Sequence, residues 1–203
     1  MALGTLMSVW LAKIAAAWRA AREGLEDHMA DRFLYFAYGS NMLTRRLHAR
    51  TSSCRVYKTG YVAEHTLTFS KISDDGSGKC YMEPIGGGAQ HVEGVLFWIE
   101  RAQKSALDEA EGLNRGYAEA SVDVVTNKAT ERAVAYIATD TDRARRPYHW
   151  YKALVIAGAV EHGLSQEYID RLWAVESRPD PMPNRRTKRE AEAALQGTGI
   201  VFE

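Results

Sequence analysis

Residues 32–41 of the chain read RFLYFAYGSN. The apolar, aromatic-rich run up to Tyr38 is typical of a buried strand. Gly39 breaks that strand, and Ser40 is a residue type that caps the helix we expect over residues 41–48. The sequence therefore predicts a strand that runs through a tight turn into a helix N-terminus.

Further strand and helix patterns follow along the chain. We expect strands at residues 55–57, 61–70, 79–85, 91–99, 117–126 and 132–139, and helices at residues 102–111, 148–162 and 165–176. Ser165 is expected to cap the last of these helices, whose apolar stripe is Ile169, Leu172 and Trp173. The strands outnumber the helices and do not alternate regularly with them, which favours an α+β domain. We expect a small mixed, mostly antiparallel β-barrel with peripheral helices.

Two segments flank the main domain expected at residues 31–178. Residues 1–30 have apolar residues at helical spacing and predict an N-terminal amphipathic helix. This helix packs on its own domain or a twin subunit, precedes a true start at Met29, or binds a membrane surface or partner; the three interpretations stay open. The Pro- and Arg-rich tail at residues 179–203 predicts a short solvated helix rather than a nucleic-acid patch.

Composition limits the classes of function. The 203 residues are 46% hydrophobic. The 26 Lys and Arg residues balance 26 Asp and Glu residues, so the chain has no net positive charge that would attract nucleic acid. No apolar run reaches the ~20 residues of a membrane span. The six histidines form no metal-ligand cluster. Cys54 and Cys80 form no C-x-x-C pair, which favours a reducing, cytoplasmic setting.

Three short stretches contain residues suited to chemistry. Backbone N–H groups at residues 38–41 lie at a strand-to-helix turn, where they suit a carboxylate or a developing oxyanion. Acidic residues crowd the helix end at residues 107–112, where i,i+4 spacing puts Glu111 on the inward face with Leu107 and leaves Asp108 and Glu109 in solvent. Residues 147–152 contain aromatics at a helix start. Taken singly, each stretch also fits an ordinary turn, a surface acid or core aromatics.

Taken together, the three stretches resemble the gamma-glutamylcyclotransferase (AIG2-like) family. The similarity runs through residues 36–41, 94–98, 107–112, 151–152 and 158–168 in the order of the family pattern. The resemblance implies a small mixed β-barrel and cleavage of a γ-glutamyl amide to 5-oxoproline and a free amine. It implies a small-molecule γ-glutamyl substrate and no cofactor, and it leaves a homodimer open.

The resemblance also implies roles for individual residues. Glu111 matches the acid/base glutamate, and Tyr151 matches a tyrosine that contacts substrate. The substrate-cradling loop matches Tyr35, Phe36, Ala37, Tyr38, Gly39, Ser40 and Asn41. The stretch after Gly112 departs from the pattern and leaves the role of Tyr117 undecided. Two other functions stay open: a cyclotransferase for a γ-glutamyl amine or natural-product intermediate, and a non-catalytic ligand-binding module of the same fold.

Overall fold

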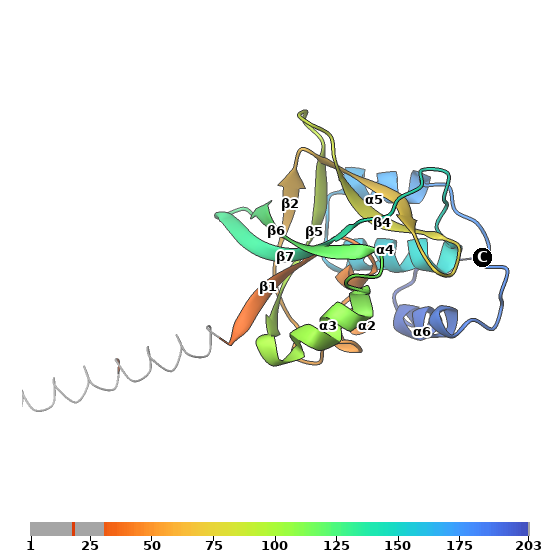
Figure 1. Ribbon diagram of the computed structural model, residues 1–203, viewed down its shortest axis with the longest axis horizontal. Helices are drawn as coiled ribbons and strands as arrows, with labels where there is room; N and C mark the ends of the chain where they lie inside the picture. Colours follow the sequence, from red (N-terminus) through yellow and green to blue (C-terminus); the bar gives the residue numbers. More distant parts are fainter. Residues whose placement is uncertain (1–17, 19–30, 203) are drawn as a thin grey trace, which may run out of the picture.

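The computed structural model describes Trp18 and residues 31–202 (Figure 1). The helix expected at residues 1–30 lies, apart from Trp18, outside the described residues. A closed barrel has the strand order β1 (Arg32–Ala37), β5 (His91–Glu100), β2 (Arg55–Ala63), β6 (Tyr117–Val125) and β7 (Thr130–Ala138). Its strands pair antiparallel except for β1 and β7, which are parallel. The prediction of a mixed, mostly antiparallel barrel is confirmed.

A second sheet consists of the antiparallel strands β3 (His65–Ile72) and β4 (Gly78–Pro84). The single strand expected at residues 61–70 is wrong, because the chain reverses at Glu64 between β2 and β3. Glu64 has a φ of 56°, in the left-handed region that non-glycine residues seldom adopt. No glycine, proline or asparagine stands between residues 61 and 70, so the sequence contains no turn signal there.

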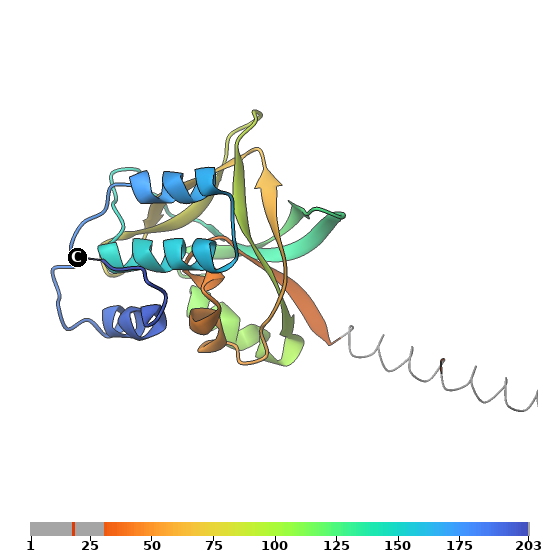
Figure 2. The ribbon, with the colours of Figure 1, turned by 180° about the vertical axis from the view of Figure 1, so that it is seen from behind.

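Four α-helices flank the barrel after β5. They are α3 (Lys104–Glu111), which follows the 3₁₀ turn η2 (Arg101–Gln103), then α4 (His149–Glu161), α5 (Gln166–Ala174) and α6 (Arg186–Leu195). Figure 2 shows α4 between α5 and α6 on one side of the barrel. Ser165 caps α5 as predicted, by accepting a hydrogen bond from the Tyr168 amide. The apolar stripe predicted to include Trp173 is wrong at that residue, whose side chain is exposed.

The segment after β1 differs from the single capped helix predicted at residues 41–48. A 3₁₀ turn, η1 (Ser40–Met42), is followed by extended Leu43 and then by the short helix α2 (Thr44–His48). Ser40 makes no capping hydrogen bond. Helix α4 packs directly on η1 at Gly158, where a Cβ atom would lie only 2.5 Å from the Leu43 amide nitrogen. Packing against α4 therefore accounts for the interrupted helix at residues 40–48, and the local sequence pattern gives no sign of this packing.

The tail folds back on the domain. The helix predicted there is α6, but its apolar side is buried against α4 through Ala191, Ala194 and Leu195 instead of being solvated. The domain boundaries predicted at residues 30 and 178 stay a prediction.

Candidate active site

A small cavity of about 30 Å³ lies where the end of β1 meets η1, α3 and α4. Residues from seven separate parts of the chain line it: Tyr35, Tyr38, Gly39, Ser40, Asn41, Cys80, Glu111, Tyr117, Tyr136 and Tyr151. Seven of these are among the residues that the sequence predicted. Phe36 and Ala37 are not: both are fully buried in the core and do not reach the cavity.

Glu111 is the last residue of α3, and the local sequence explains its direction. Leu107, one turn earlier, is fully buried, so the same helix face directs Glu111 inward. Gly112 ends the helix with a φ of 73°, a conformation that glycine adopts without strain. The Glu111 side chain is only 15% exposed and lies at the cavity wall. This places a carboxylate at the cavity.

Two side chains hold the Glu111 carboxylate. Asn41 donates from Nδ2 to Oε1, and Arg50 donates from a guanidinium nitrogen to the same oxygen at 3.1 Å. Arg50 also donates to Asn41 Oδ1 at 2.8 Å, and Asn41 Nδ2 lies 3.1 Å from the Tyr35 hydroxyl. The three side chains form a closed network, so the position of the carboxylate depends on both partners.

The first residues of η1 provide donors beside this network. Ser40 and Asn41 begin the 3₁₀ turn, so their backbone N–H groups have no partner within it. Gly39 makes close packing possible here. A Cβ atom at this position would lie 3.2 Å from Cys80 Cβ and 3.4 Å from the Tyr151 hydroxyl oxygen.

Tyrosine hydroxyls surround the cavity. The Tyr151 hydroxyl accepts a hydrogen bond from the Cys80 amide at 3.2 Å, and the Tyr117 hydroxyl donates to the Cys80 carbonyl at 3.1 Å. The Tyr38 hydroxyl donates to the Tyr136 carbonyl. Burial raises the pKa of Tyr38, Tyr117 and Tyr151 well above the ordinary value. These hydroxyls therefore stay protonated at neutral pH and act as neutral hydrogen-bond groups.

Burial also decides what Cys80 and Asp108 can do. It raises the pKa of the Cys80 thiol to about 12, so no thiolate is available for nucleophilic attack at neutral pH. The solvated position predicted for Asp108 is wrong. Its carboxylate accepts hydrogen bonds from Tyr136 at 2.5 Å and from Lys104, which ties the end of α3 to β7.

Sequence reasoning missed Arg50, Cys80 and Tyr136. No local motif marks them, because Arg50 follows a short helix and the other two lie within strands. Within the described part of the chain there is no cluster of three potential metal ligands, and no helix is long and apolar enough to span a membrane.

The small cavity opens into a larger groove of about 510 Å³. Ser40, Glu111, Tyr117 and Tyr151 line both spaces, so they form the passage between them. The groove extends over Lys71 and Lys79 of the second sheet and reaches the start of α6 at Arg185 and Arg186.

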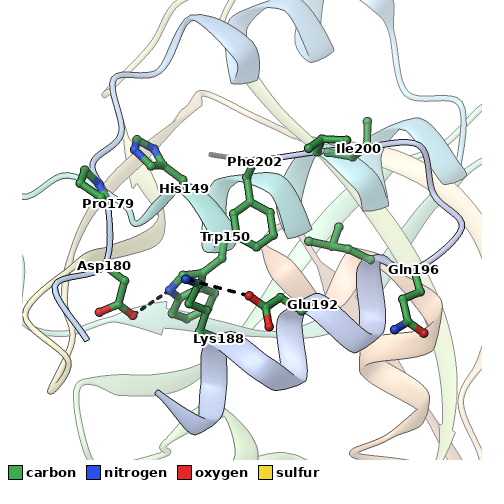
Figure 3. Close-up of a pocket in the computed structure, with 11 residues that line it drawn as sticks. His149, Trp150, Pro179, Asp180, Lys188, Glu192, Gln196, Ile200 and Phe202 are labelled. Atoms are coloured by element: carbon green, nitrogen blue, oxygen red, sulfur yellow. Dashed lines mark hydrogen bonds and ion pairs between the residues drawn. The ribbon is translucent and has the colours of Figure 1, made fainter. Parts of the chain in front are cut away.

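A separate cavity of about 430 Å³ lies between the start of α4 and α6 (Figure 3). Trp150 lines both this cavity and the groove. Its indole N–H donates to Asp180 at 3.0 Å, and Arg185 pairs with the same carboxylate at 2.8 Å (Figure 3 shows the first bond). The fully buried Asp180 side chain thus fastens the tail beside the groove.

The chain is similar to known proteins. The model of the AIG2-like family matches residues 91–172. The chain is 33% identical over 163 residues to the gamma-glutamylcyclotransferase of Mus musculus, a match that covers 76% of this chain and 84% of the mouse protein. The chain belongs to the gamma-glutamylcyclotransferase family.

Two further similar proteins support this family membership. The human gamma-glutamylcyclotransferase is 33% identical over 169 residues, which cover 79% of this chain and 84% of the human one. A solved structure described as a gamma-glutamyl cyclotransferase superposes with a TM-score of 0.70 at 28% identity, covering 80% of this chain and 99% of its own. The chain is thus an enzyme of this family.

Proposed function

We propose that the protein converts a γ-glutamyl amino acid to 5-oxoproline and the free amino acid. The observation that carries the proposal is the Glu111 carboxylate, held by Asn41 and Arg50 at the wall of a narrow cavity. The relatives named gamma-glutamylcyclotransferase support the same reaction.

The reaction begins with the substrate's own α-amine, which attacks the γ-carbonyl carbon and closes a five-membered ring. Because nucleophile and electrophile belong to one molecule, the enzyme contributes mainly orientation. The α-amine must lose a proton, and the departing nitrogen must gain one. Glu111 takes the first proton and returns it to the leaving amine as the γ-amide C–N bond breaks.

Negative charge develops on the γ-carbonyl oxygen during ring closure. We assign its stabilisation to the backbone N–H groups of Gly39, Ser40 and Asn41, which lie at the turn into η1. The Tyr151 hydroxyl, whose oxygen is 3.2 Å from the Cys80 amide nitrogen, keeps its own proton to donate to the substrate. Phe36 and Ala37 act only by holding β1 in the core.

The chemistry needs no metal, nucleotide or covalent nucleophile. Ring closure uses the substrate's own amine, and one carboxyl group transfers the proton. The high pKa of the Cys80 thiol supports a route without a covalent intermediate.

The test measures 5-oxoproline release from γ-glutamyl amino acids, γ-glutamyl amines and glutathione by the wild type and Glu111→Gln. The amide cannot accept a proton, so we expect a loss of about 10²-fold or more in kcat with an unchanged fold. Glu167→Gln, at an exposed position of α5, is the control and should retain activity. Near-normal turnover by Glu111→Gln would refute the assignment. No release from any substrate would instead favour a binding module.

A further inference from the structure

The outer groove contains more positive than negative charge. Among its lining residues seven are basic (Arg46, Arg50, Lys71, Lys79, Arg115, Arg185 and Arg186) and four are acidic (Asp74, Asp75, Glu109 and Glu111). Since the whole chain is neutral, this excess is a local property of the groove beside Glu111.

Most of these cations already have anionic partners. Arg50 pairs with Glu111 at 3.1 Å and Lys79 with Asp75 at 2.7 Å inside the groove. Arg185 and Arg186 pair with Asp180 and Glu190 of the tail. These pairs leave Arg46, Lys71 and Arg115 without an ion pair among the described residues, and of the three Arg115 is exposed to solvent.

Lys71 is more buried than Arg46. The residue is only 7% exposed, and its ammonium lies 4.9 Å from the centre of the Tyr117 ring. It also packs on Gly116, where an added Cβ atom would lie 3.1 Å from Nζ. Within residues 31–202 the Lys71 ammonium has no ion pair, and burial lowers its pKa. Four nearby carboxylates (Asp74, Asp75, Asp140 and Glu111) raise that pKa in part, but none of them pairs with the ammonium. A buried ammonium that no carboxylate contacts is unfavourable, so an incoming anion gains attraction there.

Arg46 lines the same groove. Its Nε donates to Ser40 Oγ at 3.1 Å, and it too forms no ion pair within the described residues. Burial and the neighbouring Arg50 lower its pKa to about 10. Arg46 and Lys71 also face Lys79, whose pKa both cations lower further. The groove thus contains mutually repelling cations with room for a ligand.

We propose that the groove binds the departing half of the substrate and selects a γ-glutamyl compound whose leaving amine is a dicarboxylic amino acid. Lys71 and Arg46 receive its two carboxylates, while the γ-carbonyl reaches the cavity at Glu111. The inference rests on the proposed function. The ring C–N bond forms, the γ-amide C–N bond breaks, and Glu111 carries the proton from the α-amine to the nitrogen of the departing amino acid. No other reactant is needed.

The test compares γ-glutamyl-glutamate with γ-glutamyl-glutamine, which has the same shape but one negative charge fewer. We expect kcat/KM for the glutamate substrate to be larger by about tenfold. Of Lys71→Met and Arg46→Gln, the variant that loses the partner of the side-chain carboxylate should reduce this ratio severalfold. The other, which loses the partner of the α-carboxylate, should lower kcat/KM for both dipeptides alike. Lys128→Met, in the turn at the far end of β6, removes one positive charge outside the groove and should leave the ratio as in the wild type.

The outcomes separate the two proposals. Release of 5-oxoproline from both dipeptides at similar kcat/KM would overturn the charge selection and leave the proposed function standing. A large ratio that neither Lys71→Met nor Arg46→Gln reduces would overturn the assignment to these side chains. No release from either substrate by folded wild type would overturn the proposed function, and the inference with it. If Lys71→Met does not fold, Arg46→Gln gives the decisive comparison.

Discussion

Replacing Arg50 with Met tests whether the network around Glu111 is needed for turnover. The variant loses a 3.1 Å hydrogen bond to the Glu111 carboxylate and a 2.8 Å bond to Asn41 Oδ1. It keeps an unbranched apolar side chain of similar length. Glu111 then depends on Asn41 alone, and Asn41 loses the bond that orients its amide.

The expected size of the effect follows from these contacts. A hydrogen bond to a charged group contributes ~1.5–3 kcal/mol. If that contribution is needed to place the carboxylate in the transition state, kcat falls about 10- to 100-fold. The Arg50 and Glu111 side chains are 24% and 15% exposed, so solvent partly replaces the pair in the resting protein. We therefore expect a fall in melting temperature of only a few degrees.

The assay is 5-oxoproline release under initial-rate conditions, with kcat and KM measured separately and the melting temperature recorded for each variant. Arg50→Lys keeps the positive charge but lacks the planar guanidinium group, so its kcat should lie between those of Arg50→Met and the wild type. Arg132→Met, at an exposed residue of β7 that pairs with Asp123, is the control and should match the wild type. A kcat for Arg50→Met within threefold of the wild type would show that Asn41 alone positions Glu111.

Three further changes test the fold around the site. Gly158→Ala brings a Cβ to within 2.5 Å of the Leu43 amide nitrogen, so we expect the free energy of unfolding in urea to fall by ~1–3 kcal/mol and kcat to be reduced. An unchanged urea midpoint would show that α4 moves to accept the extra methyl group. Asp180→Asn removes the ion pair to Arg185 at a fully buried carboxylate, so the tail should become more sensitive to proteolysis; equal cleavage rates would contradict the fastening role. Burial lowers the pKa of Lys79 to about 8 despite its bond to Asp75, whereas the unfolded chain keeps this proton up to about 10.5. The unfolded state therefore binds more protons between these values, and this group makes the free energy of unfolding rise with pH from about 8. Urea titrations at pH 7, 8 and 9 should show that rise in the wild type but not in Lys79→Met.

The sequence alone determined the parts of this protein that local patterns encode. The apolar run of β1, the break at Gly39, the helix end at Gly112 and the Ser165 cap each depend on near neighbours in the chain, and the structure has all four. The i,i+4 relation of Leu107 and Glu111 predicted the inward carboxylate for the same reason. Family resemblance added the reaction, because its motifs occur in order.

Tertiary structure alone decided what lies around that carboxylate. Arg50 reaches Glu111 across 61 positions of sequence, and Cys80 meets Tyr117 and Tyr151 only because the second sheet packs against the barrel. The same packing reshaped η1, buried one side of α6 and left Lys71 without an ion pair among the described residues. Periodicity reports which face of an element is apolar, but not which distant element covers it. The charge of the groove is therefore set where segments meet in space, and no single stretch of the sequence contains it.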